Sequence, residues 1–290
     1  MLNDMQPLDP EVVIEVIGWH TPNPNDEELL DGDVKDGLTR TTRGRNGAYM
    51  QVPDSTTRGK KAEETFNRYT EGFVYKYLLV MKCGERSLHD KCAKGRIAGY
   101  DINYVRCALV SIANCIKQLH KDAGLCHGDI KQRNLILEQD DDHHPKLVLC
   151  DMDASAKMGE QIGRKTSSAY CPPELAKRRF KRSDDEATVV AQASFDIWSF
   201  GVVIYELCAG RTLFSQDTAN DELVEIGDRF RLCVWHTISD DELLPVLAKA
   251  DPQRCVGNLD RTREDCKNLI RWCLKGTPAE RPQTIDDILN

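Results

Sequence analysis

The 290-residue sequence has no excess of positive charge, no Cys-x-x-Cys pair and no internal repeat. Its formal net charge is −8 and its pI is near 5.5. Nucleic acid and anionic membranes are therefore excluded as main partners, because both require a basic surface. The twelve cysteines are scattered along the chain, so no structural zinc site is predicted.

The sequence also has no apolar run long enough to span a membrane, and no charged and apolar leader of the secretory type follows Met1. We therefore expect an intracellular protein, cytoplasmic or nuclear, with reduced thiols. The apolar fraction of 40% and charged fraction of 30% are those of a globular protein. Nothing in the sequence predicts an oligomeric state.

The first 82 residues differ in pattern from the rest. Strands are predicted at 11–18 and 73–82, where apolar residues are dense, and a short helix at 62–71. Residues 21–62 are polar and show little apolar periodicity, so they are predicted to be a long mobile insertion.

From residue 83 onward the pattern is mainly helical. Residues 101–121 place apolar side chains at helical spacing, and residues 196–209 are apolar almost all round, as expected for a buried central helix. The remaining predictions are strands near 135–137 and 147–150 and helical segments at 241–249, 264–274 and 284–289.

Residues 127–134 read His-Gly-Asp-Ile-Lys-Gln-Arg-Asn and carry the most chemical information. Asp129 offers a carboxylate for a hydroxyl proton, Lys131 an ammonium for a phosphate, and Asn134 an amide for a metal. Phosphoryl transfer needs such groups together, because its catalysis is mostly positioning and charge stabilisation.

This octapeptide resembles the catalytic loop of eukaryotic protein kinases, H-R-D-x-K-x-x-N. Four further segments are similar to kinase motifs and follow in family order: Asp151-Met-Asp153, residues 166–174, Asp196-Ile-Trp-Ser-Phe-Gly201, and Arg281-Pro282. The resemblance implies an α+β, two-lobe fold with a complete, mainly helical large lobe at 83–290. Residues 1–82 would form an incomplete small β lobe.

The resemblance also implies roles for individual residues. Asp129 and Lys131 would be catalytic, Asn134 and Asp151 would hold Mg²⁺, and His127 would have a structural role in the loop. Ser167 would contact Asp129 and Lys131, Glu174 would pair with Arg281, and Asp196 would cap its helix and hold the catalytic-loop backbone. Alone, each fragment also fits an ordinary turn, cap or surface charge.

Residues 79–84 resemble the hinge between kinase lobes. Adenine of ATP would hydrogen-bond there to the backbone of Lys82 and Gly84, beside Met81, and Ile136 would pack beneath the base. The other interpretation of this segment is an edge strand ending in a turn.

The sequence departs from the family pattern in two regions. It contains no G-x-G-x-x-G loop, and no lysine stands in an apolar strand like that of V-A-I-K. Gly128 replaces the arginine before the catalytic aspartate, which makes this a non-RD loop and removes the partner of a phosphorylated Thr166, Ser167 or Ser168. Asp153 replaces a flexible glycine and adds a negative charge near the predicted metal.

Two functional hypotheses follow. The first is a serine/threonine protein kinase domain that transfers phosphate from ATP, with Mg²⁺, to a hydroxyl of a protein substrate. The alternative is a pseudokinase or scaffold, or an inactive kinase fragment without the glycine-rich loop and strand lysine. Since nothing evident grips the α- and β-phosphates, we expect this chain alone to phosphorylate poorly.

Overall fold

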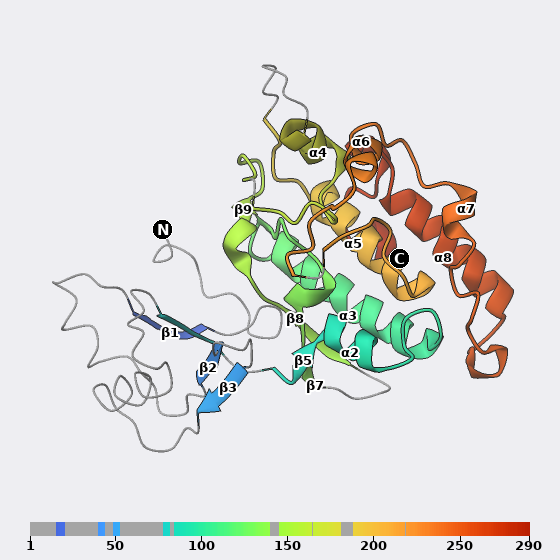
Figure 1. Cartoon of the computed structure of the whole chain (residues 1–290), viewed down its shortest axis with the longest axis horizontal. Coiled ribbons are helices and arrows are strands. Elements are labelled where there is room, and N and C mark those ends of the chain that lie inside the picture. The colour runs from blue at the N-terminus through green and yellow to red at the C-terminus, as the bar shows by residue number, and fades with distance from the viewer. Residues whose placement is uncertain are drawn as a thin grey trace. The chain divides into compact units, whose positions relative to one another are not determined.

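The structure, a computed structural model, describes residues 84–139, 145–163, 165–180, 188–217 and 219–290, and the backbone of four earlier strands. The chain divides into two compact units, with residues 14–84 in the smaller one and residues 85–290 making up the described part of the larger one (Figure 1).

The smaller unit contains an antiparallel pair of strands. β1, Val16–His20, pairs with β4, Leu78–Met81, with an irregularity between Val16 and Gly18. These strands overlap the predicted strands at 11–18 and 73–82. The rest of both ranges, and the helix predicted at 62–71, lie outside the described residues.

A second antiparallel pair occurs in the polar insertion. β2, Arg40–Arg43, pairs with β3, Tyr49–Val52, in register from Arg40 opposite Val52 to Arg43 opposite Tyr49. The prediction of irregular structure across 21–62 is therefore wrong for these two segments. The threonines, tyrosine and valine of these segments favour strands, and the Asn46-Gly47 pair between them is typical of a hairpin turn. The prediction missed this hairpin because it relied on apolar periodicity, which these segments lack.

The larger unit begins with a small sheet packed against helices. β5, Arg86–Ser87, pairs with β7, Leu135–Gln139, which pairs with β8, Lys146–Leu149, all antiparallel. Helix α2, Leu88–Lys94, lies beside β5 and β7. Helix α3, Ile102–Lys121, packs on β8 and confirms the helix predicted at 101–121, with Asp101 capping its first turn through Tyr104 N.

Short elements connect this sheet to the helical part. β6, Leu125–Cys126, pairs with β9, Ala156–Lys157, and the 3₁₀ turns η1, Gln132–Asn134, and η2, Met152–Ala154, lie between them in the chain. Helix α4, Pro173–Phe180, packs against α6, Ile226–Cys233.

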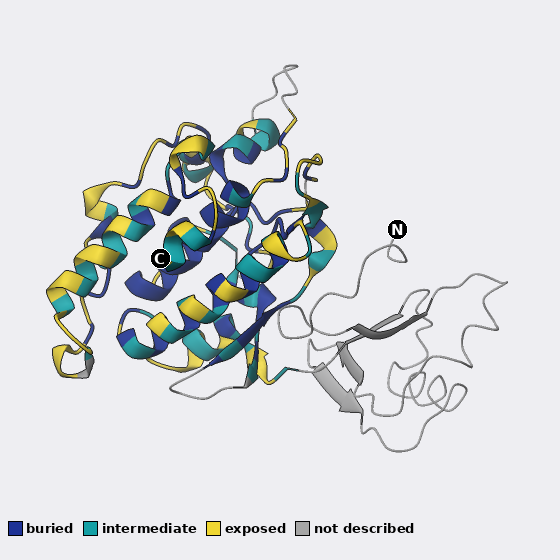
Figure 2. Cartoon of the chain, turned by 180° about the vertical axis from the view of Figure 1, so that it is seen from behind, coloured by how far each residue is buried: buried dark blue, intermediate teal, exposed yellow. Residues whose placement is uncertain are grey.

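Helix α5, Ala193–Ala209, is the centre of the larger unit. Every residue from Ser194 to Ala209 is buried, which confirms the predicted central helix (Figure 2). Helices α3 and α8, Leu259–Cys273, both pack on it. Trp198 of α5 meets Trp235 edge to face, with ring centroids 5.7 Å apart. The core therefore fixes α5, and α5 positions the loops that contact it.

The prediction of a helix over residues 241–249 is wrong in its length. Helix α7, Asp240–Leu243, is only one turn long, although Ser239 and Glu242 form a capping box at its start. Pro245 has no N–H for a helical hydrogen bond, and Leu247 adopts φ +51°. The remaining elements are η3, Pro252–Arg254, η4, Pro278–Glu280, and α9, Asp286–Leu289.

The larger unit thus combines a small sheet with a mainly helical body, in agreement with the α+β class. Within the described part of the chain, no helix combines the length and apolar character needed to cross a lipid bilayer.

Candidate active site

Residues 127–134 form a loop that Asp196 of α5 holds through its backbone. Asp196 is completely buried and accepts hydrogen bonds from His127 N at 2.7 Å and Gly128 N at 2.9 Å. His120 Nε2 lies 2.8 Å from the same carboxylate. The predicted hold on the loop backbone is thus present, but the predicted cap is wrong, because α5 begins at Ala193 with Gln192 as its N-cap residue.

Hydrogen bonds explain why the Asp196 carboxylate stays ionised in the core. Burial alone would raise the pKa of Asp196, but the bonds and charges of His120, together with His127 and the Gly128 N–H, lower it below its usual value. The helix therefore presents a fixed negative charge to two N–H groups of the loop, which defines the path of the chain into Asp129.

The ring of His127 links the loop to the end of β8. Asp129 N donates to His127 Nδ1 at 3.2 Å, and His127 Nε2 lies 3.1 Å from the carbonyl oxygen of Cys150. Since Nδ1 accepts from Asp129 N, Nε2 is the ring nitrogen that donates to the Cys150 carbonyl. His127 therefore has a structural role, because its ring links Asp129 to Cys150, the residue before Asp151.

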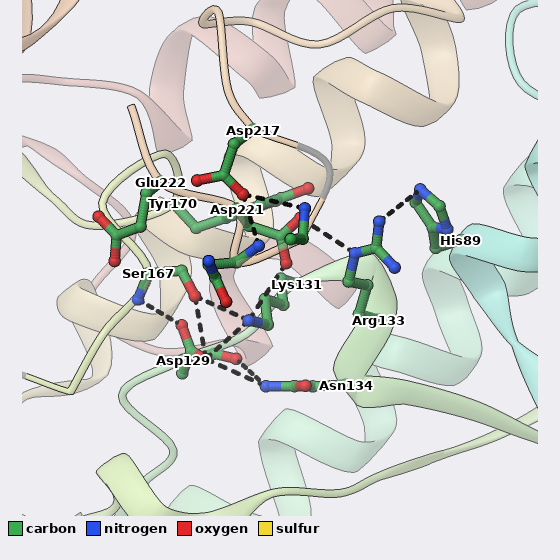
Figure 3. A network of polar contacts seen from close by, with 12 residues as sticks. His89, Asp129, Lys131, Arg133, Asn134, Ser167, Tyr170, Asp217, Asp221 and Glu222 are labelled. Carbon is green, nitrogen blue, oxygen red and sulfur yellow. Dashed lines mark hydrogen bonds and ion pairs between the residues drawn. The ribbon is translucent and has the colours of Figure 1, made fainter. Parts of the chain in front are cut away.

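The side chains of Asp129, Lys131, Asn134 and Ser167 converge on one point (Figure 3). Ser167 N donates to Asp129 Oδ1 at 2.8 Å, and Asn134 Nδ2 lies 3.2 Å from Asp129 Oδ2. Lys131 Nζ donates to Ser167 Oγ at 2.7 Å and lies 3.3 Å from Asp129 Oδ2. The structure thus brings together four predicted site residues from two segments of the chain.

The charge of Lys131 is secured by its neighbours. Burial alone would lower the pKa of Lys131, but the negative charges of Asp129 and Asp221 outweigh this effect and raise the pKa above its usual value. Lys131 is therefore a fully charged ammonium beside the Asp129 carboxylate at neutral pH.

Asp221 is a member of the cluster that the sequence motifs missed. Its carboxylate lies 3.2 Å from Lys131 Nζ and 3.1 Å from Arg133 Nε, and Arg133 in turn lies 3.3 Å from His89 Nε2 (Figure 3). Asp221 is only 2% exposed and adopts φ +58° in the segment between α5 and α6. No motif marks this segment, so only the fold brings Asp221 to the catalytic loop.

Asn134 and Asp151 are placed by a backbone contact between their segments. Cys150 N donates to the carbonyl oxygen of Asn134 at 2.9 Å. This contact brings Asp151, the residue after Cys150, beside the loop. Asn134 uses its Nδ2 on Asp129, and Asp151 is exposed at φ +64°. An amide oxygen and a free carboxylate are hard donors of the kind that Mg²⁺ prefers, so this donor set fits the predicted ion.

Glu174 and Arg281 form the ion pair predicted from the sequence. Arg281 Nη1 lies 2.8 Å from Glu174 Oε1 and Nη2 lies 2.7 Å from Oε2, a bidentate arrangement. Arg281 is 2% exposed, donates to the Ser194 and Lys275 carbonyls, and lies 5.0 Å from the centroid of the Trp198 ring. The pair joins α4 to the start of α5 and to the C-terminal segment.

The candidate hydroxyls for phosphorylation are buried. Thr166 donates to the Gly128 carbonyl at 2.6 Å, and Ser168 donates to Glu222. Thr166 and Ser168 are each 1% exposed, and Ser167 is 5% exposed. Nearby, Asp153 is exposed and pairs with Lys165 at 3.0 Å, which partly offsets the extra negative charge expected there.

The residues predicted to contact adenine are only partly described. Met81 closes β4 opposite Val16, and Lys82 lies outside the described residues. Gly84 is half-buried, and half-buried Ile136 of β7 pairs with Ser87 and Val148. Their contact with a nucleotide stays a prediction.

A family model for the protein kinase domain matches residues 64–290. The chain belongs to the protein kinase family. This establishes the kinase-like α+β fold expected from the motifs.

Individual relatives are distant and much longer than this kinase domain. A TBC domain-containing protein kinase-like protein of Gallus gallus is 25% identical over 203 residues, which cover 68% of this chain and 21% of that protein. Ribosomal protein S6 kinase alpha-2 of Mus musculus is 27% identical over 198 residues, 64% of this chain and 25% of that protein. Serine/threonine-protein kinase dkf-1 of Caenorhabditis elegans is 31% identical over 120 residues, 40% of this chain and 15% of that protein.

Gly128, the residue that makes this kinase domain non-RD, has a structural reason. Its φ is +80°, and a Cβ atom added there would lie 2.4 Å from the carbonyl oxygen of Ala154. Both the backbone conformation and the space therefore require glycine in this arrangement of the loop and η2.

Proposed function

We propose that this kinase domain catalyses transfer of the γ-phosphoryl group of ATP to serine or threonine hydroxyls of protein substrates. The observation that carries this proposal is the convergence of the Asp129 carboxylate, the Lys131 ammonium and the Ser167 hydroxyl within 3.3 Å of one another. A scaffold has no chemical need for a charged lysine and a carboxylate aligned beside a hydroxyl-bearing loop.

Asp129 orients the substrate hydroxyl in this proposal. Asp129 Oδ1 accepts one hydrogen bond, from Ser167 N, which leaves it a second lone pair for the incoming hydroxyl. As the substrate oxygen bonds to the γ-phosphorus and the phosphoanhydride bond breaks, Asp129 accepts the hydroxyl proton. Lys131 presents its ammonium to the transferred group and offsets the charge that builds up on the phosphoryl oxygens.

Asn134 and Asp151 hold the metal in the same proposal. Mg²⁺ bound there supplies charge neutralisation for the phosphates. The bonds from Asn134 Nδ2 to the Asp129 carbonyl at 2.9 Å and carboxylate at 3.2 Å turn the amide oxygen away from Asp129. His127 and Asp196 act on the reaction only through the loop backbone, and Glu174 with Arg281 stabilises the large lobe.

The nucleotide would be held by adenine contacts with the backbone of Lys82 and Gly84, beside Met81 and above Ile136. Substrates would be intracellular proteins, and the acidic net charge of −8 argues against nucleic acid as the main partner. The chain spans about a quarter or less of the relatives it matches, so the substrate of the whole protein depends on more than this domain.

A pseudokinase is the second candidate function, and a specific observation favours it. The sequence contains neither a G-x-G-x-x-G loop nor an identifiable strand lysine, the groups that grip the α- and β-phosphates in kinases. Two of the relatives also carry the name protein kinase-like. In this case the large lobe binds a partner and its catalytic loop turns over slowly or not at all.

The test measures transfer of labelled γ-phosphate, with Mg²⁺, to peptides that contain only serine, only threonine or only tyrosine. The proposal expects serine or threonine labelling that Asp129→Asn abolishes and that Asp260→Asn, a control at an exposed site on α8, leaves unchanged. Labelling that persists in Asp129→Asn would contradict it. A thermal shift with Mg²⁺-ATP but no labelling would favour the pseudokinase, and neither shift nor labelling in a folded protein would favour an inactive fragment.

A further inference from the structure

Helices α5 and α8 touch along a seam that contains three cysteines, Cys208 of α5 and Cys266 and Cys273 of α8. Gly201 of α5 lies so close to α8 that an added Cβ would be 2.7 Å from Cys273 Cβ. Cys208 follows Gly201 by seven residues, and Cys266 precedes Cys273 by seven, about two helical turns in each case. The end of α5 meets the first half of α8 through Leu247, whose N–H donates to the Cys208 carbonyl at 2.8 Å and whose own carbonyl accepts from Arg263 Nη2 at 3.2 Å. The two helices therefore run antiparallel, and Cys208 faces Cys266, which follows Arg263 by three residues.

The pair lies near the surface, at the end of α5. Cys208 is completely buried, whereas Cys266 is half-buried and follows the exposed Asp265. The helix ends at Ala209, and the next two residues, Gly210 and Arg211, are exposed. A small solute therefore reaches Cys266 first, with Cys208 directly behind it.

The two thiols differ in acidity in the direction that oxidation requires. The hydrogen bond from Cys208 lowers the pKa of Cys266, while the same bond and burial raise the pKa of Cys208 well above its usual value. In the described part of the chain, every other thiol with a shifted pKa is shifted upward, as burial raises the values of Cys92 and Cys150 to about 12. Among the thiols that the structure describes, Cys266 is thus the one most able to act as a thiolate nucleophile.

We propose that Cys208 and Cys266 form a reversible disulfide when the protein meets hydrogen peroxide, and that this bond fastens α8 to α5. In the first step the Cys266 thiolate attacks a peroxide oxygen, the O–O bond breaks, and Cys266 becomes a sulfenic acid as water leaves. In the second step the Cys208 sulfur attacks Cys266, the S–O bond breaks, and hydroxide leaves as water with the Cys208 proton. Two thiols are oxidised and one peroxide is reduced to two waters.

The disulfide between Cys208 and Cys266 would link two helices of the large lobe covalently. The bond closes the loop from residue 208 to residue 266, which contains α6, α7 and the first half of α8, and so constrains the unfolded chain. Because α5 also carries Asp196, this disulfide stabilises the helix that holds the catalytic loop. A thiol reductant reverses it.

The experiment treats the reduced protein with one equivalent of hydrogen peroxide, blocks remaining thiols, and maps the peptides by mass spectrometry. We expect a linked peptide pair containing Cys208 and Cys266, removed by dithiothreitol, and a Tm higher by about 5 °C in the oxidised protein. Cys266→Ser should lose both effects, whereas Cys255→Ser, a control at another half-buried cysteine, should keep both.

A further variant separates the two steps. Cys208→Ala should stop the reaction at the sulfenic acid of Cys266, which dimedone labels, and should show no rise in Tm. The proposal is overturned if wild-type Cys266 becomes sulfinic acid while Cys208 stays reduced, if either cysteine links to a different partner, or if Cys266→Ser shows the same oxidative rise in Tm as the wild type.

Discussion

The ammonium of Lys131 lies 3.2 Å from the carboxylate of Asp221, a buried residue of the segment between α5 and α6. Asp221 also lies 3.1 Å from Arg133 Nε, so one carboxylate holds two cations of the catalytic loop. Asp221 does not touch the predicted reacting atoms. It acts through Lys131, and its strained φ of +58° shows that the surrounding contacts fix its position.

Asp221→Asn should therefore lower the rate of phosphoryl transfer about ten-fold, since Lys131 loses one of its two charged partners. The fall should be in kcat, with KM for ATP nearly unchanged, as measured by steady-state transfer to a serine peptide. Glu225→Gln changes an exposed carboxylate of the same segment that makes no side-chain hydrogen bond to the start of α6, and it should behave as wild type. A purely structural role predicts instead a loss of stability with kcat intact.

Asp196→Asn should lower the stability of the protein and weaken the hydrogen bonds that hold the catalytic-loop backbone. The asparagine places an N–H against His127 N or Gly128 N, so one buried donor loses its acceptor. We expect the free energy of unfolding, measured in urea, to fall by about 2–4 kcal/mol. The exposed Asp240, which pairs with Arg271, provides the control, because Asp240→Asn should cost less than about 1 kcal/mol.

The difference in the free energy of unfolding between wild type and Asp196→Asn should depend on pH in a defined direction. The pKa of Asp196 is lowered in the folded protein, so its ionised form contributes stability above the unfolded value of 3.8, and this contribution is lost as the pH falls through the folded value. The gap between wild type and Asp196→Asn should therefore narrow in acid. A gap that widens in acid would exclude the ionised carboxylate as the source of stability.

Gly128→Ala tests whether this loop can carry any side chain. The added Cβ meets the Ala154 carbonyl oxygen at 2.4 Å, and φ is +80°, a region that costs an L-residue about 1–2 kcal/mol before any clash. We expect the free energy of unfolding to fall by about 2–4 kcal/mol. Gly163→Ala, at an exposed glycine with nothing within 4 Å of the added atom, should be close to neutral.

The sequence predicted the elements that depend on strong local signals. The apolar repeat of 101–121 and the apolar run of 196–209 became α3 and α5, because both segments lie in the core. The catalytic loop and the Glu174–Arg281 pair were predicted from motifs, and the structure brings their residues together. The two helices are encoded by neighbouring residues, whereas the Glu174–Arg281 pair, which spans 107 positions, was predicted because two separate local motifs resemble those of one family.

What the sequence did not predict depends on distant contacts or on single residues. Asp221 reaches Lys131 across 90 positions of the sequence, and no local pattern encodes that distance. The helix expected at 241–249 ended early because Pro245 outweighs an amphipathic pattern, and the hairpin at β2 and β3 formed without apolar alternation. The tertiary environment overrides weak local preference in such segments.

Glu206 should make stability depend on pH near neutrality. It is completely buried in α5, where burial raises its pKa to about 7 despite hydrogen bonds from Tyr170 and Gln132 to Oε2. Within the described residues its other oxygen, Oε1, has no hydrogen-bond partner. An ionised carboxylate is therefore poorly compensated at this position, and the folded protein prefers the neutral acid.

The sign of the effect follows from proton binding. Between the unfolded value of 4.5 and the folded value of about 7, the folded state holds a proton that the unfolded state has lost, so stability falls as the pH rises. Glu206→Gln removes this titration and keeps an oxygen for Tyr170 and Gln132. The free energy of unfolding of Glu206→Gln, relative to wild type, should increase by about 3 kcal/mol from pH 5 to pH 8.

Urea denaturation at both pH values measures this difference, and titrations common to both proteins cancel in it. Glu160→Gln, at an exposed glutamate, should show the same pH dependence as wild type. If Glu206→Gln also follows wild type at both pH values, then Glu206 is ionised throughout this range. A compensating donor must then reach Oε1 in solution, because an uncompensated carboxylate in the core would retain the raised pKa.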